Sequence, residues 1–209
     1  MPVCVASLAV FAVLTAAVLG HDALTSFDLT VHLAVVEHHS HTLEDIGQVV
    51  RAVSAFTVFA PLLLVVSAAV AWRQHRWLPL LCAAGATAVV GAVTLAAKVL
   101  IGRAGPDADP WSLHVDGTAY PSGHAAIAVV APALLLALLA SPGRARKAGW
   151  AGVLLWALLV GLTRIYVDEH WTSDVLAGWA LGAAVTAGTL AIASRLASGA
   201  RDRIAAFPV

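Results

Sequence analysis

The sequence predicts an all-α integral membrane protein, a bundle of six membrane-spanning helices in a single domain over residues 1–209. Its composition is 60% hydrophobic and only 11% charged, whereas soluble domains usually carry about 25% charged residues. The mean hydropathy of +0.88 also favours membrane burial. A helix needs about 20 apolar residues to cross the hydrocarbon core. Six segments approach that length, at residues 3–20, 49–72, 79–101, 124–140, 148–166 and 173–197.

The first apolar segment, residues 3–20, has the length of either a retained helix or a cleaved signal peptide. It lacks a basic n-region and a clean small-residue cleavage site, so we expect a retained helix. Residues 21–48 follow as the longest polar connection, and their mixed apolar pattern is compatible with a short helix at the membrane surface. Cys4 and Cys82 fall in or beside predicted spans, which favours buried thiols over a disulfide.

Basic residues set the predicted orientation, because cytoplasmic loops collect Lys and Arg. The short connections 73–78 and 141–147 are basic, and the connections 102–123 and 166–173 lie on the other side. With the N-terminus in the cytoplasm, the inside receives eight of the twelve Lys and Arg residues. The outside receives the remaining four, which are Arg51, Lys98, Arg103 and Arg164. Three of these four lie in polar stretches that suit chemistry, so we expect the active site on the extracytoplasmic side.

The first of three such polar stretches follows the third apolar segment. Lys98 ends that segment, and Arg103 lies five residues later. Snorkelling of the side chain to the interface would explain a lone lysine at this depth equally well. Combined with the other two stretches, however, both cations suit a site that binds an anion.

The second polar stretch, Ser122-Gly123-His124, precedes an apolar helix that is predicted to start near residue 125. Serine is a good N-cap, and the unpaired backbone N–H groups at a helix N-terminus bind anions. Gly123 would let a phosphate approach the backbone closely. Capping alone explains Ser122, but it does not require His124, which favours a site that also holds an acid or base.

The third polar stretch contains Arg164, His170 and Asp174, with apolar segments on both sides. Ionisable groups are expensive in such surroundings and are usually functional. His170 and Asp174 are four residues apart, which puts them on one face if the segment is helical. A carboxylate there can orient the imidazole and stabilise its cation, making it a better nucleophile or base. Arg164 can bind phosphate oxygens in a bidentate manner. The chemistry that these groups suit is phosphoryl transfer.

In order and spacing, the three stretches resemble the three signature motifs of the type 2 phosphatidic acid phosphatase superfamily. That family includes membrane lipid phosphatases and the vanadium haloperoxidases. The motif residues span 98–174, and the six-span layout extends the resemblance to nearly the whole chain. The residues that carry it are Lys98 to Pro106, Pro121-Ser122-Gly123-His124, and Arg164, His170 and Asp174.

The chain departs from the family pattern at two positions. The first motif usually reads Lys, six residues, Arg, Pro, and here Gly105 stands at the arginine position before Pro106. Arg103, two residues earlier, is the candidate replacement. The third motif usually opens with serine, and Thr163 stands there instead, keeping a hydroxyl group.

The resemblance implies a role for each matching residue. His170 would attack phosphorus and form a phosphohistidine, and Asp174 would hold its ring and support its charge. His124 would protonate the leaving group and then activate water. Fixed positive groups suit this chemistry, because charge spreads over the equatorial oxygens. The phosphoryl oxygens would be bound by Lys98, Arg103, Ser122, Gly123 and Arg164.

We expect neither a metal nor another cofactor, because the resemblance implies phosphoryl transfer through a histidine, for which the phosphatases of the family need no metal. His38, His39 and His41 with Glu44 and Asp45 suggest a metal site, but such tracts in outer loops are more often simply solvated. The formal net charge of zero gives no reason to expect a nucleic-acid partner.

These features together predict a phosphatase of the cell membrane whose substrate is a lipid phosphate or diphosphate. The high Ala, Val and Leu content, with only two lysines, fits a GC-rich bacterial source. In such a cell an outward-facing enzyme of this kind would recycle undecaprenyl diphosphate. Alternative substrates are phosphatidic acid and phosphatidylglycerophosphate, and transfer to another acceptor is an alternative reaction.

Two hypotheses from another class use the same cationic cluster without catalysis. A small anion transporter or channel would bind its cargo there, but such proteins often show broken helices or paired repeats, and neither is visible in this sequence. The other hypothesis is a catalytically inactive, lipid-binding member of the family, and the only residue that suggests it is Gly105.

Overall fold

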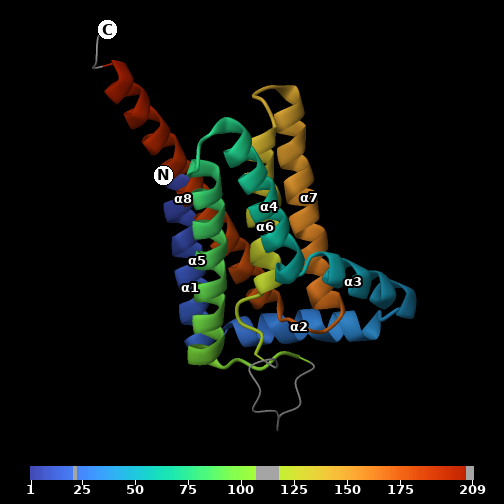
Figure 1. Cartoon of the computed structure of the whole chain (residues 1–209). Coiled ribbons are helices and arrows are strands. Elements are labelled where there is room, and N and C mark those ends of the chain that lie inside the picture. Colours follow the sequence, from blue (N-terminus) through green and yellow to red (C-terminus); the bar gives the residue numbers. More distant parts are fainter. Residues whose placement is uncertain (21–22, 107–117, 206–209) are drawn as a thin grey trace.

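The computed structural model describes residues 1–20, 23–106 and 118–205. The regular structure in these ranges is helical, apart from an isolated bridge between Ala104 and Thr118, so the all-α prediction is confirmed (Figure 1). The helices are α1 (Pro2–Gly20), α2 (Ala23–Glu37), α3 (His41–Val53), α4 (Phe56–Gln74), α5 (Leu78–Ile101), α6 (Gly123–Leu139), α7 (Arg144–Tyr166) and α8 (Thr172–Ala205).

Five helical segments in the described chain are long and apolar enough to cross a membrane. Each of the six predicted apolar segments is helical, but α6 has only 17 residues and falls short of that length. Helix α6 is also the most enclosed, since eight of its residues are buried and it packs against α4, α5, α7 and α8. An apolar helix surrounded by other helices needs less contact with lipid than one at the edge of the bundle.

Close packing of α6 on α8 depends on two glycines of α8. A Cβ atom at Gly178 would collide with the carbonyl oxygen of Ser122. One at Gly182 would lie 2.6 Å from the carbonyl oxygen of Ala126. Close approach of backbones through small residues is a common way for membrane helices to associate. It places the beginning of α6 directly against the beginning of α8.

The region between the first and second spans differs from the prediction. Residues 21–48 were expected to hold one short surface helix, and they contain α2 and most of α3 (Figure 1). The apolar segment predicted at 49–72 is interrupted, because α3 ends at Val53 and α4 begins at Phe56. Arg51 therefore belongs to α3 and not to a membrane span. Both α2 and α3 lie crosswise at the lower end of the bundle (Figure 1).

Two further helices extend beyond their predicted limits. Helix α7 begins at Arg144, four residues before the apolar segment, and α8 continues to Ala205. Residues 107–117 of the predicted outer connection lie outside the described residues. Cys4 and Cys82 are free thiols, as expected, and both are half-buried.

Candidate active site

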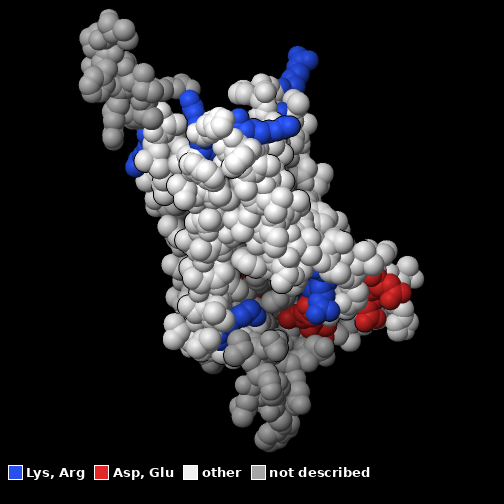
Figure 2. All heavy atoms as spheres, in the orientation of Figure 1, with Lys and Arg blue, Asp and Glu red and all other residues white. Residues whose placement is uncertain are grey.

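The two ends of the bundle differ in charge. In Figure 2 the upper end shows basic residues, the middle is an uncharged belt, and the lower end shows both acidic and basic groups. At the lower end α5 ends, α6 begins, α7 ends and α8 begins (Figure 1). These are the helix ends that carry the three polar stretches, so the fold gathers residues that are far apart in the sequence.

The beginning of α6 has the expected cap. Ser122 is fully buried, and its hydroxyl accepts a hydrogen bond from the Ala125 N–H at 3.4 Å. The Ser122 N–H donates to the carbonyl oxygen of Asp174 at 2.9 Å, which ties this helix start to α8. Gly123 and His124 begin the first turn of α6, and the start of a helix is a place that favours an anion.

His170 and Asp174 lie together as predicted, although His170 is in the turn before α8 and the two residues do not share a helix. Nδ1 of His170 is 3.7 Å from Oδ2 of Asp174, which is longer than a hydrogen bond but close enough for charge interaction. Such contacts often tighten only when substrate is bound. Asp174 is fully buried, and the same Oδ2 accepts the Trp171 N–H at 2.9 Å. Asp174 thus caps the first turn of α8 as well as facing His170.

Arg103 reaches this carboxylate from the loop after α5. Its Nη1 donates to Oδ1 of Asp174 at 2.5 Å and to the hydroxyl of Ser173 at 2.7 Å. Its Nη2 donates to Oδ2 of Asp28 at 2.7 Å. Both terminal nitrogens therefore contact carboxylates, an arrangement that suits positioning of Asp174 better than binding of phosphate.

Asp28 is a residue of this site that the sequence did not reveal. It lies on α2, is 1% exposed, and accepts hydrogen bonds from the N–H and the hydroxyl of Ser173. Its one signal in the sequence is a carboxylate between the apolar residues Phe27 and Leu29. That pattern does not indicate which residue pairs with Asp28, because its partner Arg103 is 75 residues away in the sequence.

A second ionic cluster surrounds Glu169. Its Oε2 accepts from Nη1 of the fully buried Arg164 at 2.6 Å. Its Oε1 lies 3.1 Å from Nε of Arg51, which comes from α3. One carboxylate therefore lies between two guanidinium groups. The sequence predicts Arg164 as a site residue, and it assigns no role to Arg51 or Glu169.

The loop after α5 is held firmly against α8. Lys98 donates from Nζ to the carbonyl oxygen of Thr118, so its ammonium group lies near the end of this loop. The indole of Trp171 donates to the carbonyl oxygen of Ala104 at 2.9 Å. Gly105 lies where the family usually has arginine, and a Cβ there would be 3.0 Å from the Glu169 carbonyl oxygen. A larger residue at position 105 would crowd that backbone.

Helix α1 also contacts this end of the molecule. Tyr120, fully buried just before Ser122, forms a hydrogen bond of 2.8 Å with the hydroxyl of Thr15. Burial raises the pKa of the Tyr120 hydroxyl, so it stays neutral. The first apolar segment is thus part of the packing that supports the site.

The histidine tract forms a separate cluster at the beginning of α3. His39, His41 and Glu44 bring their ligand atoms within 4.8 Å of one another. The two histidines are exposed, and Glu44 lies 3.5 Å from one and 3.6 Å from the other. Pairing with a nearby carboxylate in water accounts for this arrangement, and the prediction of no metal stays a prediction.

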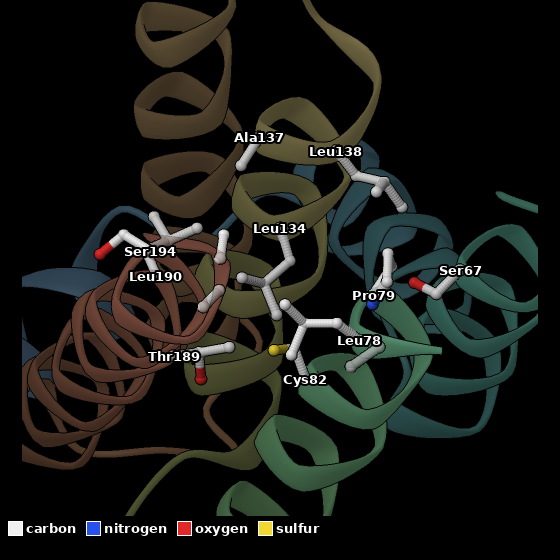
Figure 3. A pocket seen from close by; sticks show the side chains of 13 residues that line it. Ser67, Leu78, Pro79, Cys82, Leu134, Ala137, Leu138, Thr189, Leu190 and Ser194 are labelled. Atoms are coloured by element: carbon white, nitrogen blue, oxygen red, sulfur yellow. The ribbon is translucent and has the colours of Figure 1, made fainter. Parts of the chain in front are cut away.

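Two hollows differ in what they can bind. A groove of about 430 Å³ opens beside His124 between α3 and α4 and is lined also by Arg51 and Phe56. A pocket of about 340 Å³ lies at the opposite end of the bundle and is walled by residues such as Cys82 and Leu134 (Figure 3). The latter has no charged residue in its lining, so only the groove suits a phosphate.

Comparison with known proteins gives a consistent result. The family model described as the PAP2 superfamily matches residues 79–197. Phosphatidylglycerophosphatase B of Bacillus subtilis is 30% identical over 185 residues, which cover 84% of this chain and 88% of that protein. An undecaprenyl-diphosphatase of Sulfolobus acidocaldarius is 46% identical over 63 residues, covering 30% of this chain and 28% of the relative.

A solved structure shares the fold. The crystal structure of a transmembrane PAP2-type phosphatidylglycerolphosphate phosphatase from Bacillus subtilis matches with a TM-score of 0.81 and 24% sequence identity. The match covers 93% of this chain and 98% of that one. A family model that covers more than half of the chain, and a relative aligned along most of its length, agree with the residues gathered at the lower end. The chain therefore belongs to the PAP2 superfamily and is a multi-pass membrane lipid phosphatase, a hydrolase of phosphomonoesters.

Proposed function

We propose that this phosphatase removes the terminal phosphate of phosphatidylglycerophosphate. The observation that carries the proposal is the alignment with phosphatidylglycerophosphatase B along 84% of the chain. Undecaprenyl diphosphate is the second candidate, favoured by a relative with higher identity over only 30% of the chain. The local match covers less than a third of this chain, whereas the alignment with phosphatidylglycerophosphatase B covers most of it.

In the first chemical step, Nε2 of His170 attacks phosphorus, because Nδ1 faces Asp174. An N–P bond forms as the bond from phosphorus to the glycerol oxygen breaks. His124 donates a proton to that oxygen, so glycerol leaves as a neutral alcohol. The carboxylate of Asp174 stabilises the positive charge that develops on the His170 ring.

In the second step, His124, now neutral, takes a proton from a water molecule. The water oxygen attacks phosphorus, the N–P bond breaks, and inorganic phosphate leaves His170 free. The charge on the phosphoryl oxygens is stabilised throughout by Lys98, Arg164 and the N-terminus of α6. Ser122 and Gly123 supply that helix start.

Arg103 has a different role in this scheme. Its two terminal nitrogens contact the carboxylates of Asp28 and Asp174. We propose that it holds Asp174 in place, and that it does not replace the arginine missing at Gly105. Asp28 in turn holds Arg103, so a residue of α2 supports the catalytic carboxylate.

The site faces the extracytoplasmic side in this proposal, which rests on the distribution of basic residues. The upper end in Figure 2 shows Lys and Arg without acidic neighbours, as expected of a cytoplasmic face. The lower end, where the site lies, has both signs of charge. A lipid in the outer leaflet would then have its head group on the same side of the membrane as the groove.

Release of inorganic phosphate tests the function. Purified protein in detergent is given phosphatidylglycerophosphate, phosphatidic acid and undecaprenyl diphosphate in separate assays that contain EDTA. We expect the highest kcat/KM with phosphatidylglycerophosphate, and no loss of activity from EDTA. The His170→Ala variant, which should be inactive on all three lipids, is the control. Faster cleavage of undecaprenyl diphosphate than of phosphatidylglycerophosphate would reverse the order of the two candidates.

A further inference from the structure

We infer that Arg51 of α3 binds a second phosphate group of the substrate, the one that stays with the leaving group. This role rests on the proposed function and makes that function more specific. Phosphatidylglycerophosphate carries an internal phosphodiester in addition to the terminal monoester that is cleaved. Phosphatidic acid carries the monoester alone. Arg51 would therefore act as a specificity-determining residue that distinguishes these two lipids.

The residues around Glu169 carry a net positive charge that an anion can balance. Arg51 and Arg164 both contact this one carboxylate, at 3.1 Å and 2.6 Å. Two positive groups share one negative group, so the three residues carry one net positive charge. Glu169 also holds both guanidinium groups in place before a substrate arrives.

The two arginines differ in accessibility. Arg164 is fully buried, whereas the side chain of Arg51 is 52% exposed. Among the described residues, Arg51 also donates from Nη1 to Gln48 at 3.2 Å, a partner on the same exposed face of α3. Arg51 can therefore contact Glu169 and still offer N–H groups to a ligand from the membrane surface. Arginine suits this task, since its planar group binds phosphate through more than one hydrogen bond.

The position of Arg51 identifies which phosphate it meets. It lines the groove of about 430 Å³ together with His124. Because His124 is the residue proposed to protonate the leaving oxygen, that groove holds the leaving group. In phosphatidylglycerophosphate the leaving group is the glycerol that carries the phosphodiester. A guanidinium beside this groove would face the diester anion, while Lys98 and Arg164 bind the phosphate under attack.

The test compares Arg51→Gln with wild-type protein on two lipids of matched acyl chains, phosphatidylglycerophosphate and phosphatidic acid, in mixed micelles. We expect kcat/KM for the two-phosphate lipid to fall by about 10- to 100-fold, as for loss of a charge-assisted hydrogen bond, mainly through a higher KM. Activity on phosphatidic acid should change by less than about twofold. Arg51→Lys should recover part of the loss, and Arg73→Gln at the opposite end is the matched control.

The two lipids distinguish failure of the role inferred for Arg51 from failure of the proposed function on which that role rests. Retained phosphatidic acid hydrolysis shows that Arg51→Gln is folded, so a selective loss supports the role of Arg51. Equal losses on both lipids, or no loss on either, would overturn it while leaving the phosphatidylglycerophosphatase activity of the wild type established. A wild-type protein that hydrolyses neither lipid would overturn the proposed function and this role together.

Discussion

Asp174 is held on three sides by groups of different kinds. The guanidinium of Arg103 contacts one oxygen, and the backbone N–H of Trp171 and the ring of His170 face the other. A carboxylate fixed in this way cannot turn toward water when charge develops on the histidine. Such preorganisation is a large source of catalytic power, because nothing has to rearrange during the reaction.

Asp28→Asn should weaken this arrangement without unfolding the protein. The amide oxygen can still accept from Ser173, but Arg103 loses a charged partner at 2.7 Å. We expect kcat to fall by about 10- to 100-fold with little change in KM, since Asp28 is buried against Ser173 and Arg103. Steady-state kinetics on phosphatidylglycerophosphate measure this. Asp45→Asn, a change to an exposed carboxylate of α3, is the control and should have no effect.

The two histidines should respond differently to the leaving group. The leaving group of a lipid phosphate is a basic alkoxide, which needs a proton. The leaving group of a nitrophenyl phosphate is a weakly basic phenolate, which scarcely needs one. General acid catalysis is typically worth about 10²- to 10⁴-fold. His124→Ala should therefore slow lipid cleavage far more than formation of the phosphoenzyme from the aryl phosphate. His170→Ala should abolish turnover with both.

Transfer of labelled phosphate to the protein is a second test of the roles of His124 and His170. Acid-labile, base-stable label should accumulate on His170 in His124→Ala, because His124 is also needed to activate water. Equal losses on both substrates, without a trapped phosphohistidine, would contradict the roles assigned to these residues.

Among the helices, α6 and α8 carry the site between them. The backbone contact from Ser122 to Asp174 joins their first turns, and Gly178 and Gly182 let the helices approach. The spacing of the anion site at the start of α6 from His170 therefore depends on how closely these helices pack. A change in that packing moves one half of the site relative to the other.

Gly178→Val should damage both stability and activity. Its Cβ would collide with the Ser122 carbonyl oxygen, and overpacking of this kind costs about 1–3 kcal/mol. We expect a lower Tm in detergent and a lower kcat. Gly152→Val on α7 is a matched control, since nothing lies within 4 Å of a Cβ there. If the two variants were equally stable and active, the close contact between α6 and α8 would not determine the site.

At the scale of the whole molecule, hydropathy predicted the approximate place of the apolar helices, because length and composition decide what a bilayer accepts. It predicted six spans, whereas five segments of the described chain are long and apolar enough to cross a membrane. The break between α3 and α4 was missed, since Ser54 and Ala55 interrupt the helix without interrupting the apolar pattern. The motif residues were predicted by their spacing. Asp28 and Arg51 were not, because their partners depend on how distant helices dock.

The predicted orientation can be tested on the intact protein in cells. Single cysteines at Lys147 and at His41, both exposed, are introduced after Cys4 and Cys82 are changed to serine. An impermeant maleimide added outside should label position 41 and spare position 147 until the membrane is broken. Labelling of position 147 alone in intact cells would reverse the proposed orientation.

The short length of α6 determines where hydrolysis takes place relative to the bilayer. Its 17 residues extend about 26 Å, less than the roughly 30 Å thickness of the hydrocarbon core. We therefore expect the N-terminus proposed to receive the phosphate to lie below the level at which lipid head groups normally sit. A substrate would then have to move inward to reach it, and water would have to follow. Membranes of different thickness should therefore change the rate without any change in the protein.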